Sequence, residues 1–395
     1  MIILKWTKQH DYHAHFSKNE ITTYYQYLQT HLVDHRDTRG KKHELAFVLV
    51  SFVAAIFRSV GKLSFTSLHR MMQRDHDFLV AQTGATSPCC ISRVQLMRVL
   101  EKLDTNSLNT LHQAYFCQDA LRQAHPWQAV DGKELRGSID KSVGAKRGEN
   151  VIFAVNHLDG QSQLLGYYSG QKDSEKTLVR DHFRQETDLS GQAYSLDALH
   201  CHPGVLAEID SKQGFYLTQV KGNQPILAED LVFQEQVSSS QGSLQSVEKA
   251  HGRIEQRRAS LYGIEVDCLE SRWHKANVQS MMVIERKTER CKTSQKSCEK
   301  AYYISNMAAH PDNGIALFNA IRGHWRVESN NYIRDTTFGE DDIRTKKCGL
   351  IRTLATFLNL AINQLQKRNQ LANLNILRES IAYERDLLYQ CFAIG

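Results

Sequence analysis

The order of apolar runs between residues 127 and 236 constrains the fold of this chain more than any other feature. Three runs rich in Val, Ile, Phe and Tyr come first and predict strands: WQAVD (127–131), NVIFAVNHLDG (150–160) and QLLGYYSGQ (163–171). Helices predicted at 174–185, 203–212 and 225–236 then alternate with strands at 193–197 and 215–220. Three strands followed by alternating helices and strands indicate a mixed sheet with helices on its faces.

This order predicts an α/β protein with a ribonuclease H-like core, whose first part spans residues 121–237. Residues 1–120 are expected to form an all-helical amino-terminal domain, because apolar residues recur at intervals of three and four from Lys42 to Tyr115. A β-rich insertion is predicted at 238–312, since runs such as VQSMMVIERK and KAYYISN are typical of strands. Residues 313–395 then complete the core with helices.

Composition places the chain among globular proteins. It has 395 residues, of which 41% are hydrophobic and 23% charged, enough for a substantial core with one or two satellite domains. The longest apolar run, Leu45–Phe57, is shorter than the roughly 20 residues of a membrane span and predicts a buried helix. The amino terminus lacks a signal-peptide layout, so we expect a cytoplasmic, nucleoid-associated protein with no membrane contact. The net charge of +6 is compatible with a polyanionic partner but does not identify one.

Three acidic residues occupy positions at which they could share metal ions. Asp131 ends the first predicted strand, Asp197 ends the fourth, and Glu328 lies on a late helix. Ligands of open α/β sheets gather at the carboxyl ends of strands near a switch in strand order, where both aspartates would lie. Each acid alone is more simply explained as a turn residue or a solvated helix residue. Their combination is what favours a catalytic site.

Carboxylate oxygens are the ligands that Mg²⁺ and Mn²⁺ prefer. Two such cations, roughly 3.5 to 4 Å apart, activate the attacking oxygen and stabilise the leaving oxygen in phosphodiester chemistry. The sequence therefore predicts a site with two Mg²⁺ or Mn²⁺ ions and no organic cofactor.

Five separated motifs resemble, in order, the H-repeat-associated type of DDE transposases encoded by prokaryotic insertion sequences. They are DGKELRGS (131–138), DALH (197–200), KGNQ (221–224), HGRIEQR (251–257) and GHWRVESNNYIRDTTFGEDDIR (323–344). The resemblance covers roughly residues 40 to 365. It implies a catalytic triad of Asp131, Asp197 and Glu328, with the β-rich insertion between the second aspartate and the glutamate.

The resemblance also implies an activity and its partners. A transposase of this type would bind terminal inverted repeats as a homodimer or higher oligomer, cleave the transposon ends and join them to target DNA. One departure concerns the hairpin-forming branch of related enzymes, which often has a lysine seven residues after the catalytic glutamate, where this chain has Asp335. The strand-transfer details of that branch are therefore not carried over. The alternatives are a domesticated DNA-binding derivative and a nuclease without transposition.

Several polar residues near the acids are candidates for DNA contact. Lys133 and Arg136 would hold a scissile phosphate or belong to a solvated turn. Lys221, Asn223 and Gln224 follow a strand end, and either meet the DNA or form a plain polar loop. The remaining candidates lie beside an insertion strand or beside Glu328: His251, Arg253, Arg257, Arg322, His324, Trp325 and Arg326.

Two tryptophans and the basic residues of the amino-terminal helices are further candidates for DNA contact. Trp325 is more often a core residue than a base-stacking platform, and Trp273 would hold an unstacked base or be an ordinary strand residue. The amino-terminal helices would recognise transposon ends, or their basic residues would form a solvated face. Those residues are Arg58, Lys62, His69, Arg70, Arg74 and Arg93.

Overall fold

A computed structural model of the chain describes residues 19–37, 41–116, 127–170, 172–250, 252–368 and 373–394. The chain divides into two compact units. The first comprises residues 1–121, 337–343 and 353–395, and the second comprises residues 122–336 and 344–352. The first unit holds the amino-terminal and carboxyl-terminal helices. The second holds the sheet.

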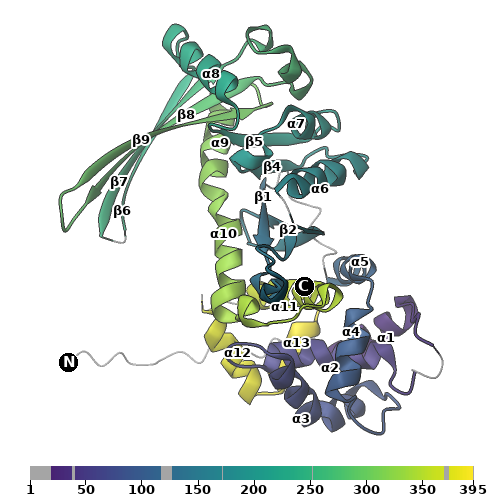
Figure 1. Ribbon diagram of the computed structural model, residues 1–395. Helices are drawn as coiled ribbons and strands as arrows, with labels where there is room; N and C mark the ends of the chain where they lie inside the picture. Colours follow the sequence, from purple (N-terminus) through teal and green to yellow (C-terminus); the bar gives the residue numbers. More distant parts are fainter. Residues whose placement is uncertain are drawn as a thin grey trace, which may run out of the picture. The chain divides into compact units, whose positions relative to one another are not determined.

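The first unit is helical. It contains α1 (Glu20–His31), α2 (Leu45–Arg58), α3 (Phe65–Thr83), α4 (Arg93–Glu101), α5 (Thr105–Phe116), most of α11 (Cys348–Arg368), α12 (Leu374–Tyr383) and α13 (Asp386–Phe392). The helices predicted between Lys42 and Tyr115 are present as α2 to α5. The carboxyl-terminal helices pack on the amino-terminal ones, with α12 and α13 against α2 and α13 against α1 (Figure 1).

Helix α2 is the centre of this unit, since every residue from Leu45 to Arg58 is buried. The expectation of a buried helix in this apolar run is confirmed. None of the helices in the described ranges combines the length and apolar character that a bilayer crossing requires. The proposed DNA contact by Arg58 is wrong, because its side chain is 1% exposed and its guanidinium donates to Asp75 Oδ1 at 2.7 Å and to the Ala382 carbonyl at 2.9 Å.

The second unit is built on one nine-stranded mixed sheet, which confirms the predicted α/β class. Its order is β3-β2-β1-β4-β5-β9-β8-β7-β6. The first five strands are β1 (Trp127–Glu134), β2 (Glu149–Asn156), β3 (Ser162–Ser169), β4 (Ala193–Leu196) and β5 (Phe215–Val220). Strands β1, β2 and β3 form an antiparallel meander, whereas β4 pairs parallel with both β1 and β5.

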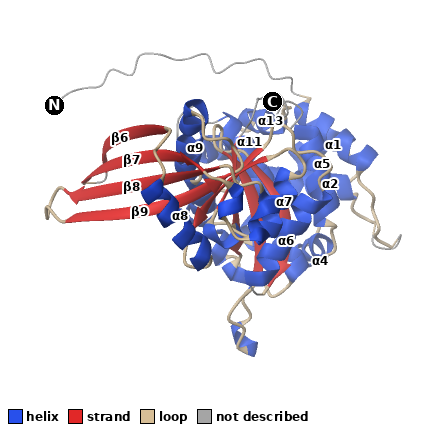
Figure 2. Ribbon diagram, turned by 90° about the horizontal axis from the view of Figure 1, so that it is seen from above, coloured by secondary structure: helices blue, strands red, loops and turns tan. Residues whose placement is uncertain are grey.

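The β-rich segment extends this same sheet. It consists of β6 (Gly242–Ala250), β7 (Arg253–Gly263), β8 (Ser280–Arg290) and β9 (Lys296–Ser305), all antiparallel to their neighbours. Because β9 also pairs antiparallel with β5, the inserted strands continue the sheet instead of forming a separate one. Their outer ends project from the helix-covered part of the unit (Figure 2).

Helices cover both faces of the sheet. Helices α6 (Lys172–Gln185) and α7 (Pro203–Asp210) pack on one face, and α9 (Pro311–Gly323) and α10 (Trp325–Tyr332) pack on the other, while α8 (Pro225–Val237) follows β5. Alternation along a strand accounts for the two cores: Tyr216 joins the cluster with Val179 and Phe183 of α6, and its neighbour Leu217 joins that of Leu317 and Phe318 of α9.

We expect the Arg58–Asp75 pair to be essential to the first unit. Asp75→Ala leaves a buried guanidinium without its carboxylate and should lower the free energy of unfolding by about 3 to 5 kcal/mol. Asp77→Ala on the same helix is the control: its side chain is exposed, and its effect should stay within about 0.5 kcal/mol. Urea denaturation of both variants measures the difference; equal effects would show that the pair contributes nothing special.

Candidate active site

The structure places Asp131 and Asp197 next to each other. Val130 of β1 lies opposite Leu196 of β4 in parallel register, and the two aspartates are the residues that follow. Strand β1 has an antiparallel neighbour on its other side, so the aspartates lie where the strand direction switches. This is the position at which open α/β sheets bind their ligands.

The environment of Asp131 opposes its ionisation. Burial raises the pKa of this carboxyl to about 7, and the charges of Asp197 and Glu175 add to the effect, while the Gly132 N–H and His200 lower the pKa. A pKa near neutrality means that the proton on Asp131 is easily displaced by a bound cation. Three carboxyl groups, those of Asp131, Asp197 and Glu175, thus influence one another near the junction of β1 and β4.

Glu175 is the residue that the sequence analysis missed. It lies on α6, is 8% exposed, and accepts a hydrogen bond of 2.6 Å from the Tyr168 hydroxyl. The Nε2 atom of the fully buried His200 lies 3.3 Å from Glu175 Oε1 and 3.9 Å from Asp197 Oδ1. Two motif residues could have pointed to Glu175 in the sequence, namely Gly132 of DGK and His200 of DALH. In the structure both lie next to its carboxylate.

The turn after β4 is held in place by the loop after β5. Asp197 Oδ1 accepts hydrogen bonds from the backbone N–H groups of Leu199 and His200, at 2.9 and 3.3 Å. Asn223 donates to the Ala198 carbonyl at 2.7 Å, and Gln224, 6% exposed, donates to the Cys201 carbonyl at 2.8 Å. These two amides therefore position the Asp197 turn, whereas Lys221 of the same loop is exposed.

His324 fixes the start of the helix that carries Glu328. It stands between α9 and α10, and its Nδ1 lies 2.9 Å from the hydroxyl of Ser195, two residues before Asp197. The same hydroxyl lies 2.9 Å from Nε2 of His157 at the end of β2. Burial lowers the pKa of His324, and the charge of Asp197 opposes this effect, so His324 and Asp197 are electrostatic neighbours.

The far end of the same helix is anchored on the strand that carries Asp131. Lys133, 6% exposed, forms an ion pair of 2.8 Å with Asp335, and the Arg334 guanidinium lies 4.4 Å from the ring centroid of Phe153, which pairs with Asp131. Helix α10 therefore runs over β1 and β2 between one anchor on β4, at Ser195, and one on β1, at Lys133. Glu328 lies between these anchors, with its side chain exposed.

No complete metal site is formed by these side chains. Within the described ranges, no group of three or more His, Cys, Asp or Glu residues is arranged to hold a metal ion. The structure joins Asp131, Asp197 and Glu175 electrostatically, and it places Glu328 on the helix above β1. The donors nevertheless fit a hard divalent cation, because they are carboxylates whose mutual repulsion such an ion would relieve.

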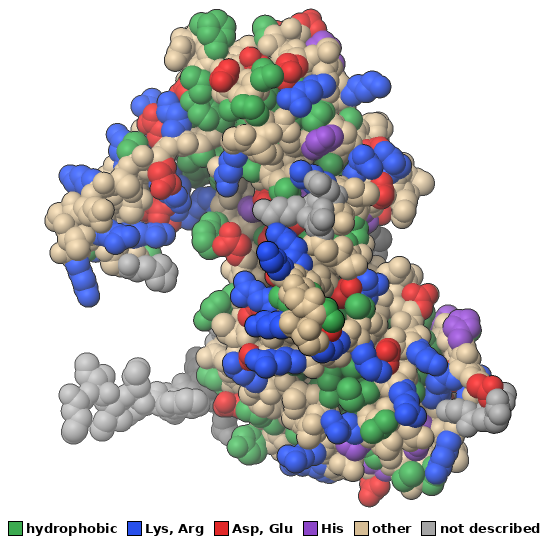
Figure 3. Space-filling view, in the orientation of Figure 1, with side chains coloured by type: hydrophobic (Ala, Val, Ile, Leu, Met, Phe, Trp, Pro, Cys, Tyr) green, Lys and Arg blue, Asp and Glu red, His purple; other side chains and the backbone are tan. Residues whose placement is uncertain are grey.

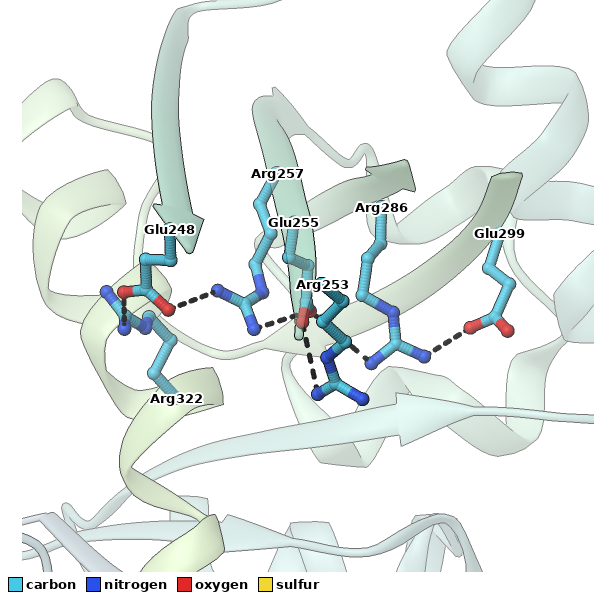
Figure 4. Close-up of polar contacts among 7 residues, drawn as sticks. All are labelled: Glu248, Arg253, Glu255, Arg257, Arg286, Glu299 and Arg322. Carbon is cyan, nitrogen blue, oxygen red and sulfur yellow. Dashed lines mark hydrogen bonds and ion pairs between the residues drawn. The ribbon is translucent and has the colours of Figure 1, made fainter. Parts of the chain in front are cut away.

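Several predicted DNA contacts belong to a charge ladder across the inserted strands (Figure 4). Glu255, 5% exposed, forms ion pairs with Arg257 at 2.5 Å, Arg253 at 3.2 Å and Arg286 at 3.8 Å. Arg257 also reaches Glu248, which pairs in turn with Arg322 of α9. The predicted contacts Arg253, Arg257 and Arg322 are thus held by glutamates, and His251 lies outside the described residues.

Trp325 and Trp273 occupy opposite environments. Trp325 is 64% exposed, so the favoured prediction that it belongs to the core is wrong. Trp273 is fully buried, which excludes the base-stacking role considered for it. Arg136 and Arg326 are exposed, and Arg326 donates to the His157 carbonyl at 3.1 Å. Lys and Arg side chains also spread over the projecting strands β6 to β9 (Figure 3).

Comparisons with known proteins show which family this chain belongs to. The chain is 25% identical over 283 residues to "Putative transposase YncI" of Escherichia coli O157:H7. It is 30% identical over 287 residues to an uncharacterised protein of the dhlA 3′ region in Xanthobacter autotrophicus. It is 32% identical over 133 residues to "H repeat-associated putative transposase YbfD" of Escherichia coli K12. No family model matches the chain.

The matched segments cover 68%, 70% and 33% of this chain, and 70%, 92% and 51% of the three relatives. The chain spans 63% of another Escherichia coli relative, YbfL. An α/β fold and similarity over most of the chain place it among transposase relatives. The chain belongs to the H-repeat-associated transposase family.

The raised pKa of Asp131 predicts a pH-dependent stability. From about pH 4 to pH 7 the unfolded chain has lost this proton whereas the folded chain retains it, so rising pH favours unfolding across that window. In metal-free buffer at pH 7.5, Asp131→Asn should therefore raise the free energy of unfolding by about 1 to 3 kcal/mol, or a few degrees in Tm. Thermal unfolding at pH 4 should show no such gain. A variant less stable than wild type at pH 7.5 would contradict the assignment.

Proposed function

We propose that this protein is a DDE transposase in which Asp131, Asp197 and Glu328 hold two Mg²⁺ or Mn²⁺ ions. The observation that carries the proposal is the adjacency of Asp131 and Asp197 at the switch in strand direction, in a chain of this family. The proposed reaction is cleavage at the transposon ends followed by strand transfer into target DNA.

The order of the first five strands supports a ribonuclease H-like core. In the order β3-β2-β1-β4-β5, an antiparallel meander is followed by two strands parallel to β1, with α6 and α7 connecting them. We propose that this part is the catalytic core, with the β-rich segment inserted between Asp197 and Glu328.

The proposed chemistry divides the work between the cations and the protein. When bound, the two cations activate the attacking water or 3′-hydroxyl and stabilise the leaving oxygen. Asp131 would lose its proton on becoming a ligand, and its near-neutral pKa makes this loss easy. The loop amides of Asn223 and Gln224 keep the Asp197 turn in place. The anchors at His324 and Asp335 fix α10, so that Glu328 is presented along β1.

The surface around the carboxylates supports DNA as the partner. Trp325 and Arg326 have exposed side chains on α10, the helix that carries Glu328. Arg136, just after β1, and Lys221, just after β5, are exposed as well. Lysine and arginine bind phosphates, and an exposed tryptophan can stack on an unpaired base. We propose that the chain acts at the nucleoid as a homodimer or higher oligomer, because two transposon ends must be cut and joined together.

A cleavage assay on DNA carrying the element's ends tests the proposal. Asp131→Asn and Glu328→Gln should each reduce Mg²⁺-dependent cleavage by about a thousandfold or more, because a lost ligand removes several kcal/mol of transition-state stabilisation. Binding to the same DNA should persist. Asp181→Asn, on α6 with a side chain that is 44% exposed, is the control and should cleave like wild type.

The products distinguish the related activities. Strand-transfer products are expected alongside cleaved ends, whereas cleavage alone would indicate a nuclease without transposition. Cleavage that persists in both the Asp131 and Glu328 variants would refute the proposal.

A further inference from the structure

We propose that Asn330 is a positioning residue of the active site, whose side-chain amide donates a hydrogen bond to the Asp131 carboxylate when that carboxylate binds a cation. This inference rests on the proposed function and adds to it a residue of α10, two positions after Glu328. Three observations carry it: the burial of the amide, the face of α10 on which it lies, and its level along β1.

Asn330 is a buried amide without a partner in the described part of the chain. Its side chain is 1% exposed, and neither Oδ1 nor Nδ2 has a hydrogen-bond partner there. Buried polar groups are nearly always paired, because an unpaired one destabilises the folded chain. A leucine of about the same size would avoid this cost. The amide is therefore available to a neighbouring group that needs a donor.

Asn330 lies on the face of α10 that packs on the sheet. Val327, Asn330 and Arg334 are all buried and recur at intervals of three and four, so they form one stripe along the helix. The Arg334 guanidinium lies 4.4 Å from the ring centroid of Phe153, which pairs with Asp131. Cross-strand partners project from the same face of a sheet. The Asn330 amide and the Asp131 carboxyl therefore enter the same layer, between α10 and β1.

The anchor at the start of α10 places Asn330 level with Asp131. His324 lies beside Ser195, and Ser195 pairs with Ala129 of β1. Helix and strand run in the same direction, since the second anchor ties the far end of the helix to the end of β1. Asn330 follows His324 by about 9 Å of helix, and Asp131 follows Ala129 by about 7 Å of strand. Helical side chains tilt toward the helix N-terminus, which brings the amide back to the level of Asp131.

An amide suits a carboxylate that also binds a cation. One oxygen of Asp131 would contact the cation, and the other would accept a hydrogen bond from Nδ2 of Asn330, which fixes the direction of the first. The amide is neutral, so it adds no charge to a place where Asp131, Asp197 and Glu175 already influence one another. Loss of such an outer partner typically weakens metal binding by roughly ten- to a hundredfold.

Asn330→Leu tests the inference through two measurements on the full-length chain. Mn²⁺ affinity, measured by isothermal titration calorimetry at pH 7.5, should fall about tenfold or more, because the Asp131 carboxylate loses its donor. The Tm in metal-free buffer should rise by about 2 to 4 °C, because the unpaired buried amide is gone. Ser329→Ala, at the exposed neighbouring position of α10, is the control and should match wild type in both.

Two further variants separate the proposed hydrogen bond from packing. Asn330→Asp keeps the shape of the side chain but replaces its donor with an oxygen, so it should weaken Mn²⁺ binding at least as much as Asn330→Leu. Combined with Asp131→Asn, the leucine substitution should weaken Mn²⁺ binding no further than Asp131→Asn alone, because the carboxylate that the amide orients is absent.

The outcomes separate this inference from the proposed function. Normal Mn²⁺ affinity in the Asn330 variants, alongside loss in Asp131→Asn, would overturn the role of Asn330 and leave the proposed function standing. A lower Tm in Asn330→Leu would mark a purely structural residue and overturn it as well, as would additive losses in the double variant. Absence of Mn²⁺ binding by the wild-type chain would contradict the proposed function, and this inference with it.

Discussion

Burial of a carboxyl group beside two other acids at the junction of β1 and β4 is the constraint on which the rest of this unit depends. Parallel pairing brings Asp131 and Asp197 to adjacent positions, and Glu175 approaches from α6 over Gly132. Burial and the two neighbouring charges raise the pKa of Asp131 to about 7, so the folded chain stores an unfavourable interaction at this point. Sites that bind cations through carboxylates have this character, because the bound ion relieves the repulsion.

The surrounding structure holds these acids together against their repulsion. Side-chain amides of the loop after β5 fix the Asp197 turn, and Ser195 ties His157 to His324 at the start of α10. The Lys133–Asp335 ion pair anchors the other end of that helix to β1. Asp335 stands where a related branch has lysine, and here lysine comes from β1 and pairs with that aspartate. The sheet and its two helical layers thus rigidly position charges that would otherwise separate.

The periodicity of apolar residues predicted most of the strands and helices of the second unit, because this periodicity depends only on residues close together in the sequence. Strands β1 to β5 and helices α6 to α8 lie close to where the apolar runs indicated. Asp197 directly follows β4 as predicted, whereas the prediction that Asp131 ends its strand is wrong, because β1 continues to Glu134. Non-local contacts were not predictable. The pairing of β9 with β5, the packing of α12 on α2 and the approach of Glu175 to Gly132 join segments far apart in sequence. The sequence also did not reveal which side chains are exposed to solvent. Arg58 and Trp273 are buried, whereas Trp325 is 64% exposed.

Anomalous diffraction from crystals grown with Mn²⁺ tests the central claim most directly, because it locates the ion without reference to activity. The account predicts anomalous peaks in contact with the carboxylates of Asp131 and Asp197, with Glu328 oriented toward the same ions. Crystals saturated with Mn²⁺ that show no peak at these carboxylates, or that hold the ion elsewhere in the second unit, would contradict it.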